Sequence, residues 1–491
     1  MTGKHRVQIL GDCSVKRKPN FLFINSDQHR FDSLGANGNP VVKTPNLDRL
    51  AGEGIRFANA YTPCPVCTPA RASMLNGQWS FTHRCLSTPE IAEMQCAFDV
   101  SAPLVNKILR EQGYRQSYIG KWHLEGWSKN KFRPSPLDAG FDDYIPEAAY
   151  SGWYRENFGP PAPIHREPGE GNPYKMHLNV VDHNISHERS RLHWGADEAI
   201  RRLRGHAAED SPFFLRWDPS EPHLPCVVPS DYGSIYSIND IPLWGSVNDT
   251  LEGKPYIMRK LRSVWGIGEA TDGEIREMIR LYFATITLLD YEIGRVTSEL
   301  ERLGLMDSTV IIYTTDHGDM CGSHRLVDKH YNMYDDVTRV PLLIRYPAAF
   351  KKGSTSGSFT SHALDLAATV CSLAGADIPG TFQGISLLNN GDTGREDILS
   401  AYHGAQFGLF SQRMLRNQKY KYVYNAADMD ELYDMEQDPW ELDNLSQSSA
   451  HAAIVRDMRR RMYDRLKGYN DPLMSTIWMH NELYMNKKPD R

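Results

Sequence analysis

The sequence predicts an α/β fold: a large, mostly parallel or mixed central sheet flanked by helices, and a smaller C-terminal subdomain with an antiparallel sheet. Short apolar runs typical of buried strands alternate with amphipathic helical segments up to about residue 380. Beyond that point the pattern changes to alternating aromatic residues, as in "YKYVY", which is typical of an antiparallel strand. The chain has 491 residues, more than one core usually holds, so a division into two parts fits its length.

The first strand is predicted in "NFLFINSD", an apolar run that ends in polar residues and in Asp27. A helix should follow in "TPNLDRLAGEGIRF", with Thr44 as N-cap and Pro45 at the first helical position. The same alternation recurs along the chain. Further helices are expected over 102–113, 195–206, 273–304 and 452–466, and further strands over 114–120, 212–220 and 308–319.

Composition excludes several classes of protein. The net charge is -6 with 24% charged residues, which favours neither a nucleic-acid partner nor a disordered chain. No apolar stretch reaches the ~18 residues of a membrane helix, and no signal peptide follows the basic N-terminus, so we expect no membrane partner and a cytoplasmic location. The 8 cysteines are sparse and fit reduced thiols. Nothing in the sequence specifies an oligomeric state.

We expect three regions along the chain. Residues 1–18 would form an N-terminal extension, residues 19–380 the catalytic α/β domain, and residues 381–491 the C-terminal subdomain. In a mostly parallel sheet, ligands collect outside the carboxyl ends of the strands. The functional residues of the catalytic domain are therefore expected where its strands end.

The segment "CPVCTPARASMLNG" contains two cysteines, Cys64 and Cys67. Taken alone, this pair indicates a redox site or half of a zinc site. A zinc site would need a second pair or histidines at ligand spacing, and a thioredoxin-like pair belongs early in a small domain. A redox or zinc-binding protein nevertheless stays as an alternative from a different functional class.

The position of Cys67 favours anion binding. Pro69 suits the first turn of a helix, so residue 67 should lie at or just before a helix N-terminus. Free N–H groups and the helix dipole favour an anion there. A tetrahedral sulfate or phosphate group would be held at this point.

The run from Cys67 to Arg71, "CTPAR", followed by "ASMLNG", resembles the signature of the type I sulfatases, members of the alkaline phosphatase superfamily. In that family the cysteine is oxidised to formylglycine, which implies a formylglycine-generating enzyme as a partner. The aldehyde hydrates to a geminal diol. A bound metal would lower the pKa of one hydroxyl, and the resulting alkoxide would attack sulfur.

Two strand ends offer metal ligands, Asp27-Gln28 and Asp316-His317. The resemblance implies that these residues, together with residue 67, hold one divalent cation. Oxygen ligands suit Ca²⁺, and His317 would also admit Mn²⁺ or Zn²⁺.

The ligand pairs depart from the commonest sulfatase pattern. Many family members have a second Asp where this chain has Gln28, and Asn where it has His317. The combination is similar to that of phosphonate monoester hydrolases and of some bacterial sulfatases. Fewer ligand charges leave a metal more electrophilic, so hydrolysis of a phosphonate monoester or phosphodiester at the same site is the nearest alternative.

Basic residues complete the predicted site. "GKWH" resembles the Lys-x-His segment of sulfatases, in which Lys121 would bind a sulfate oxygen and His123 would contact the diol. His223 in "SEPHLP" and Lys329 in "LVDKHYN" would bind sulfate and protonate the leaving oxygen, and Arg71 would compensate the alkoxide. Phosphonate hydrolases lack the Lys-x-His pair, so its presence favours sulfate.

The predicted reaction is hydrolysis of a sulfate monoester, from a small molecule or a saccharide, to an alcohol and inorganic sulfate. Covalent catalysis would divide this reaction into two easier steps. Loops around 125–180, 225–265 and 400–415 should form the walls of the pocket. A non-catalytic binding module is the remaining alternative, and it would be unaffected by Cys67→Ala or by metal removal.

Overall fold

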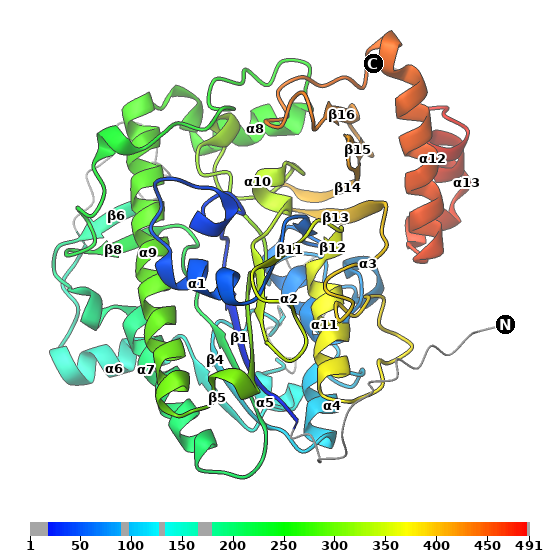
Figure 1. Ribbon diagram of the computed structural model, residues 1–491. Helices are drawn as coiled ribbons and strands as arrows, with labels where there is room; N and C mark the ends of the chain where they lie inside the picture. Colours follow the sequence, from blue (N-terminus) through cyan, green and yellow to red (C-terminus); the bar gives the residue numbers. More distant parts are fainter. Residues whose placement is uncertain (1–17, 90–97, 127–132, 165–178, 489–491) are drawn as a thin grey trace.

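The structure is a computed structural model that describes residues 18–89, 98–126, 133–164 and 179–488 (Figure 1). Its centre is a sheet of eight strands: β1 (Asn20–Ser26), β2 (Ile55–Phe57), β4 (Arg115–Gly120), β5 (Asp143–Pro146), β7 (Phe213–Asp218), β9 (Thr309–Thr315), β10 (Leu342–Arg345) and β11 (Ser354–Ser356). In space the order is β11-β2-β10-β9-β1-β7-β4-β5. Only β10 runs antiparallel to its neighbours. The predicted fold, with its large and mostly parallel sheet, is confirmed.

Helices cover both faces of this sheet. The helices before residue 380 are α1 (Pro45–Glu53), α2 (Cys67–Asn76), α3 (Ser80–His83), α4 (Val105–Glu111), α5 (Pro136–Ala139), α6 (Ala149–Phe158), α7 (Arg191–Ala207), α8 (Tyr256–Trp265), α9 (Asp272–Arg302), α10 (Asp335–Thr338) and α11 (His362–Leu373). Of these, α3, α8 and α10 pack in clusters with the C-terminal sheet. Phe21 and Phe23 of β1 pack in the core that includes α2, α4 and α11. Leu22 and Ile24 pack on the opposite face with α1, α7 and α9. Because both faces are buried, the strand is a continuous apolar run.

Four neighbouring strands, β9, β1, β7 and β4, are all parallel, so their carboxyl ends meet at one edge of the sheet. Asp27 follows β1, Asp316 follows β9, Asp218 ends β7, and Lys121 follows β4. Open α/β sheets bind ligands at such an edge. This topology brings together residues that are almost 300 positions apart in the sequence.

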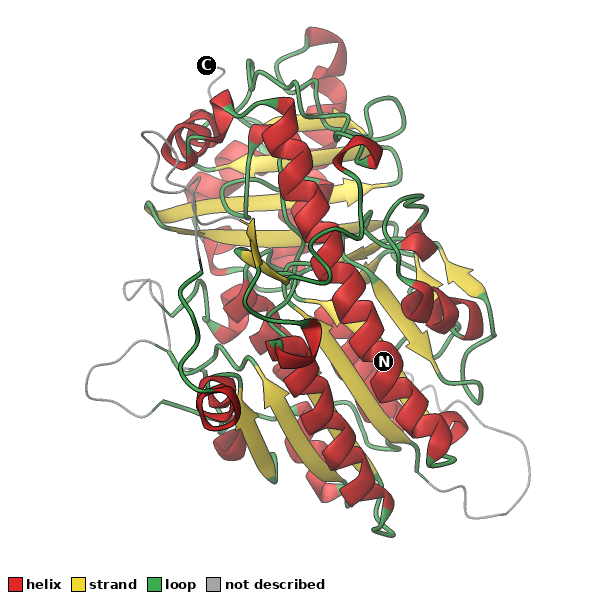
Figure 2. Ribbon diagram, turned by 90° about the vertical axis from the view of Figure 1, so that its left-hand side faces the viewer, coloured by secondary structure: helices red, strands yellow, loops and turns green. Residues whose placement is uncertain are grey.

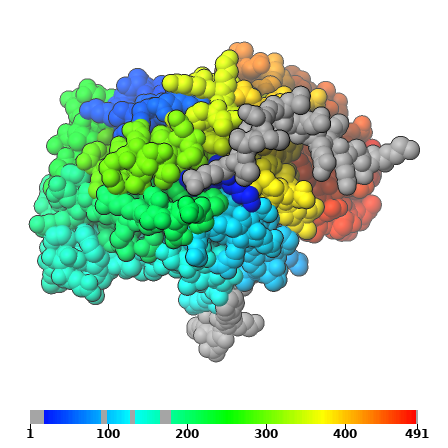
Figure 3. Space-filling view, turned by 60° about the horizontal axis from the view of Figure 1, so that its bottom comes forward, coloured from blue at the N-terminus to red at the C-terminus, as the bar shows by residue number. Residues whose placement is uncertain are grey.

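The C-terminal part forms a second sheet with the order β13 (Asp397–Ala405), β14 (Gly408–Asn417), β15 (Tyr420–Asn425) and β16 (Glu431–Asp434). All its neighbours are antiparallel, and α12 (Ala452–Gly468) packs on it with α13 (Ile477–Met479) beyond. Figure 2 shows these strands crossing above the central sheet, and Figure 3 shows the C-terminal residues gathered on one side. The predicted antiparallel sheet is confirmed.

Two short pairs of strands lie outside the main sheets, β3 (Ala60–Tyr61) with β12 (Thr360–Ser361) and β6 (Asn179–Asp182) with β8 (Cys226–Pro229). Of the predicted N-terminal extension, residues 1–17 lie outside the described residues, and the boundary at 380/381 stays a prediction. Within the described ranges, no helix has the length and apolar character needed to cross a membrane. The six cysteines that the structure describes are buried free thiols.

The N-terminus of α1 is capped from a distance. Thr44 occupies the N-cap position as expected, but its hydroxyl accepts a hydrogen bond from the Gly35 amide instead of one from the helix. Asp290 of α9 takes the cap role, since its carboxylate accepts the amides of Asn46 (3.1 Å) and Leu47 (2.7 Å). Local sequence could not reveal a cap that lies more than 240 positions away.

We expect Asp290→Ala to lower the free energy of unfolding by about 1–3 kcal/mol, because two helix amides would lose their acceptor in a buried place. Urea unfolding measures this change. Asp377→Ala, at an exposed position, is the control and should be nearly neutral. Equal effects of the two substitutions would contradict the capping role.

Candidate active site

Four side chains gather at the edge where β1 and β9 end and α2 begins. Asp27, Cys67, Asp316 and His317 place one ligand atom each within 4.8 Å of one another, and all four are buried. The Cys67 Sγ lies 3.1 Å from His317 Nε2 and 3.8 Å from Asp27 Oδ1. Cys67 is the first residue of α2, so the predicted position at a helix N-terminus is confirmed.

This donor set fits a divalent cation. The His317 Nδ1 contacts the Gly318 carbonyl oxygen at 2.8 Å, which directs Nε2 into the cluster. Burial alone would lower the pKa of His317, but Asp316 and Cys67 raise it to about 9. The cluster therefore favours positive charge, as expected for a set of ligands that binds a cation.

Gln28 adds an amide oxygen beside this cluster. Its Nε2 donates to Asp319 Oδ2 at 2.7 Å, and its Oε1 accepts from Lys329 Nζ at 2.9 Å. These two bonds fix which end of the amide is the carbonyl oxygen. The backbone φ of Gln28 is 68°, and His123, Asp328 and His330 also have positive φ values. Such conformations are costly for non-glycine residues and gather at functional sites.

Arg71 joins three buried carboxylates from three strands. Its guanidinium contacts Asp316 Oδ2 and Asp27 Oδ2 at 3.0 Å each and Asp218 Oδ2 at 2.8 Å. Asp218 also accepts from Arg216 and from the Tyr118 hydroxyl. Arg71 thus compensates the carboxylates around residue 67 and is itself fixed by the ends of β1, β7 and β9.

Two lysines surround the thiol with positive charge. Lys121 Nζ lies 2.7 Å from Asp27 Oδ2, and Lys329 Nζ lies 2.9 Å from His223 Nε2. Burial would raise the pKa of the Cys67 thiol, but Lys329, Lys121 and His317, together with a hydrogen bond from His123, hold it well below its ordinary value. An anion at residue 67 is therefore strongly favoured.

Cys64 has the opposite environment. It is fully buried in an apolar cluster that includes Tyr61 and Val66, and burial raises the pKa of its thiol to about 12. In the part of the chain that the structure describes, it belongs to no cluster of metal-binding side chains. The two cysteines are not equivalent, and this difference does not favour a redox pair or a zinc site.

A cavity of about 700 Å³ opens beside the cluster. Lys121 and His223 lie at the end next to the cluster, and α6, the start of α7 and β8 form its walls. The predicted loop regions 125–180 and 225–265 contribute residues to this lining, whereas 400–415 contributes none among the described residues.

Comparison with known proteins agrees with this geometry. Residues 19–376 match the family profile described as Sulfatase. The chain belongs to the sulfatase family. Residues 322–467 of this sulfatase also match the C-terminal region of N-sulphoglucosamine sulphohydrolase.

Relatives of this sulfatase span almost its full length. It is 31% identical to an uncharacterized sulfatase of Escherichia coli, YidJ, over 94% of this chain and 90% of the relative. It is 28% identical to an N-acetylglucosamine-6-O-sulfatase of Bacteroides thetaiotaomicron, over 93% and 87%. The phosphonate monoester hydrolase of Agrobacterium radiobacter has a similar structure, with a TM-score of 0.77, 25% identity and coverage of 93% and 95%. The chain is therefore a sulfuric ester hydrolase with an alkaline phosphatase-like fold.

The structure brings all the predicted site residues of this sulfatase together. It also adds carboxylates that sequence reasoning missed: Asp218 holds Arg71, Asp319 holds Gln28, and Asp328 lies 3.1 Å from Lys329 Nζ. Asp218 ends a strand just as Asp27 and Asp316 follow theirs. That shared position is the signal that could have found it.

Proposed function

We propose that this sulfatase hydrolyses a sulfate monoester through a formylglycine formed from Cys67. The observation that carries the proposal is the placement of Cys67, which begins α2 within the "CTPAR" signature and lies among carboxylates, lysines and histidines. The Cys67 Sγ occupies the place that an oxygen of the hydrated aldehyde would take. A formylglycine-generating enzyme would be needed to make the modification.

The site residues suit one divalent cation, with Ca²⁺ the first candidate and Mn²⁺ or Zn²⁺ as others. Asp27, Gln28, Asp316, His317 and residue 67 would hold it. When bound, such a cation would lower the pKa of a hydroxyl on residue 67 and neutralise charge on the sulfate.

In the first step a hydroxyl oxygen of the residue 67 hydrate attacks sulfur, and the bond between sulfur and the ester oxygen breaks. Lys121 and Lys329 would bind the sulfate oxygens as charge develops. The His223 Nε2 lies 2.9 Å from Lys329 Nζ, so this pair can deliver a proton to the leaving alcohol. The product is an alcohol and a sulfated hemiacetal at residue 67.

In the second step the remaining hydroxyl of the hemiacetal loses its proton, and the carbon–oxygen bond to sulfate breaks. His123, whose hydrogen bond reaches residue 67, would accept that proton. Sulfate leaves, the aldehyde forms again, and water hydrates it. Division of hydrolysis into these two displacements is the advantage of covalent catalysis.

Two measurements test this proposal. Mass spectrometry of the peptide containing residue 67 should show the mass loss of a thiol-to-aldehyde conversion in active protein, and 4-nitrophenyl sulfate should be hydrolysed. A plain cysteine in fully active protein would refute the mechanism.

A second candidate function is hydrolysis of phosphonate monoesters or phosphodiesters at the same site. Gln28 and His317 favour it, as does the likeness to the phosphonate monoester hydrolase. The ratio of kcat/KM for an aryl sulfate to that for the matching aryl phosphonate monoester separates the two. We expect this ratio to exceed one, because Lys121 and His123 form the Lys-x-His pair typical of sulfatases.

Removal of the cation should lower stability. A ligand present at 100 times its Kd stabilises a folded protein by about 2.7 kcal/mol, so chelation should lower the midpoint of thermal unfolding and added Ca²⁺ should restore it. Asp27→Asn, which weakens the ligand set, should reduce this response. If Ca²⁺, Mn²⁺ and Zn²⁺ all left the midpoint of chelated protein unchanged, the cation assignment would be wrong.

A further inference from the structure

We propose that the cavity beside the catalytic cluster binds the uncharged, hydroxylated half of the ester, so that the substrate is a neutral sugar carrying a single sulfate group. This inference rests on the proposed function and deepens it. With a volume of about 700 Å³, the cavity lies within the range of pockets that enclose small-molecule ligands. The polar, aromatic and charged side chains of its walls indicate which class of alcohol the ester contains.

One wall of the cavity begins at the reaction centre itself. The Glu221 carbonyl oxygen accepts a hydrogen bond from the Asp27 amide at 3.3 Å, and Pro222 pairs with Asp27 as a parallel bridge. His223, the next residue, reaches Lys329. An ester bound at residue 67 therefore has the Glu221 segment directly beside its alcohol half.

A fixed polar cluster lies on this wall. Arg191 contacts Glu221 Oε1 through Nε (2.9 Å) and Nη2 (2.7 Å), and it contacts Glu147 Oε1 through Nη1 (2.5 Å). Ser220 Oγ donates to the other oxygen of Glu147 at 2.6 Å. None of the described residues donates a hydrogen bond to Glu221 Oε2. The cluster thus presents a carboxylate acceptor, held by an arginine with several N–H groups, to the cavity.

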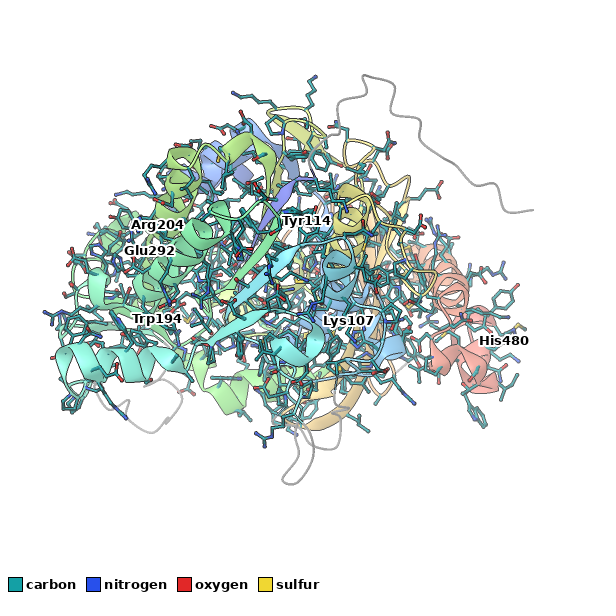
Figure 4. All side chains as sticks on the ribbon, turned by 90° about the horizontal axis from the view of Figure 1, so that it is seen from below. Lys107, Tyr114, Trp194, Arg204, Glu292 and His480 are labelled. Carbon is teal, nitrogen blue, oxygen red and sulfur yellow. The ribbon has the colours of Figure 1, made fainter. Side chains whose placement is uncertain are left out.

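Such a pair matches the chemistry of a sugar. Each hydroxyl group both donates and accepts a hydrogen bond, and a carboxylate next to a guanidinium offers an acceptor and donors together. Tyr150 and Tyr154 of α6 line the cavity and supply aromatic surface. The ring centroids of Tyr150 and of Trp194 in α7 are 5.9 Å apart. Figure 4 shows Trp194 on the side of the molecule away from His480.

The charges of the walls argue against a second anionic group. Among the described residues, and apart from Lys121 and His223 next to residue 67, the charged side chains of the lining are those of two arginines, Arg155 and Arg191, and three carboxylates, Glu147, Asp182 and Glu221. The Asp, Glu and Arg residues that the structure describes on these walls therefore sum to a net charge of −1. A carboxylate or a second sulfate on the sugar would be repelled here, whereas the sulfate at residue 67 faces lysines.

The first experiment compares substrates with the formylglycine-containing, cation-loaded enzyme. The probes are 4-nitrophenyl sulfate and the 2-, 3-, 4- and 6-monosulfates of glucose and galactose. The matched anionic probes are the disulfates of the same sugars and the corresponding uronate monosulfates. We expect kcat/KM for the best neutral monosulfate to exceed that of its anionic counterparts by about tenfold or more, which corresponds to about 1.4 kcal/mol.

The second experiment uses Glu221→Gln. Loss of the carboxylate should lower the ratio of sugar-sulfate to aryl-sulfate kcat/KM by about tenfold, mainly through KM, because a hydrogen bond to a charged group contributes about 1.5–3 kcal/mol. The control is Glu53→Gln, which removes a carboxylate that pairs with Arg345 and does not line the cavity. The control should leave this ratio unchanged.

The outcomes separate this inference from the proposed function. A preference for disulfates or uronates, an unchanged ratio in Glu221→Gln, or hydrolysis of the aryl sulfate with no turnover of any sugar sulfate would overturn the inference while the proposed function stands. No turnover of aryl or sugar sulfates by protein that carries the aldehyde would overturn both.

Discussion

Cys67→Ala should lower kcat for 4-nitrophenyl sulfate by at least about 10⁴-fold, as loss of the nucleophile does in other covalent hydrolases. The alanine side chain can form neither an aldehyde nor its hydrate, so the attacking oxygen is lost. Lys121, Lys329 and His223 would remain in place, and the variant should still bind sulfate. Steady-state kinetics at saturating substrate, with sulfate inhibition as a second readout, measures both effects.

Cys64→Ala is the matched control. Cys64 lies three residues away, is equally buried and is also a free thiol. Its replacement removes a small packed group and should leave kcat almost unchanged. Equal losses for the two substitutions would favour the redox or zinc-binding alternative. Unchanged hydrolysis in Cys67→Ala would favour a protein whose activity does not depend on residue 67.

The cluster around residue 67 could be predicted because each of its residues stands in a local sequence pattern that is recognisable by itself. Asp27 and Asp316 follow apolar strands, and Cys67 lies at a Pro-containing helix start. Parallel strands that are neighbours bring such ends to one edge. The strand order β9-β1-β7-β4 places these ends next to one another. The resemblance to sulfatases gives the expected role of each residue.

The supporting carboxylates could not be assigned in this way. Asp218 and Asp319 act on Arg71 and Gln28 through contacts that span 147 and 291 positions. Their partners depend on the order of the strands and on the course of the loop after β9, which no local pattern specifies. The polar cluster of Glu147, Arg191 and Glu221 is likewise assembled from three separate segments.

Asp319 also alters the interpretation of Gln28. The sequence indicates one fewer ligand charge than in the commonest sulfatase pattern, which would make a bound cation more electrophilic. The structure places a carboxylate 2.7 Å from the Gln28 amide nitrogen. Burial and Asp328 raise the pKa of Asp319 to about 6, so it is largely ionised at neutral pH. The carboxylate that is missing at position 28 is therefore replaced by that of Asp319, which contacts Gln28 instead of the cation site itself.

Arg71→Ala should strongly lower both the free energy of unfolding and kcat. It would leave Asp27, Asp218 and Asp316 buried without their shared partner, and removal of one member of a buried ion pair costs about 3–5 kcal/mol. The ends of β1 and β9 would also lose the group that fixes their carboxylates. Since small misplacements of reacting groups can cost about 10²-fold, kcat should fall by at least that factor. Urea unfolding of chelated protein and steady-state kinetics measure the two effects.

Arg413→Ala is the control that separates the loss of stability from the loss of kcat. Arg413 is also buried, and it pairs with Asp471 at 2.7 Å in the C-terminal part. Its loss should destabilise the fold by a similar amount but leave kcat per folded molecule unchanged. Arg71→Lys should recover stability only in part, because a single ammonium group cannot contact three carboxylates as a planar guanidinium does. If Arg71→Ala and Arg413→Ala reduced kcat equally, Arg71 would be a structural residue. A loss of kcat in Arg71→Ala but not in Arg413→Ala would show that Arg71 positions residue 67 and the carboxylates around it for the reaction with the ester.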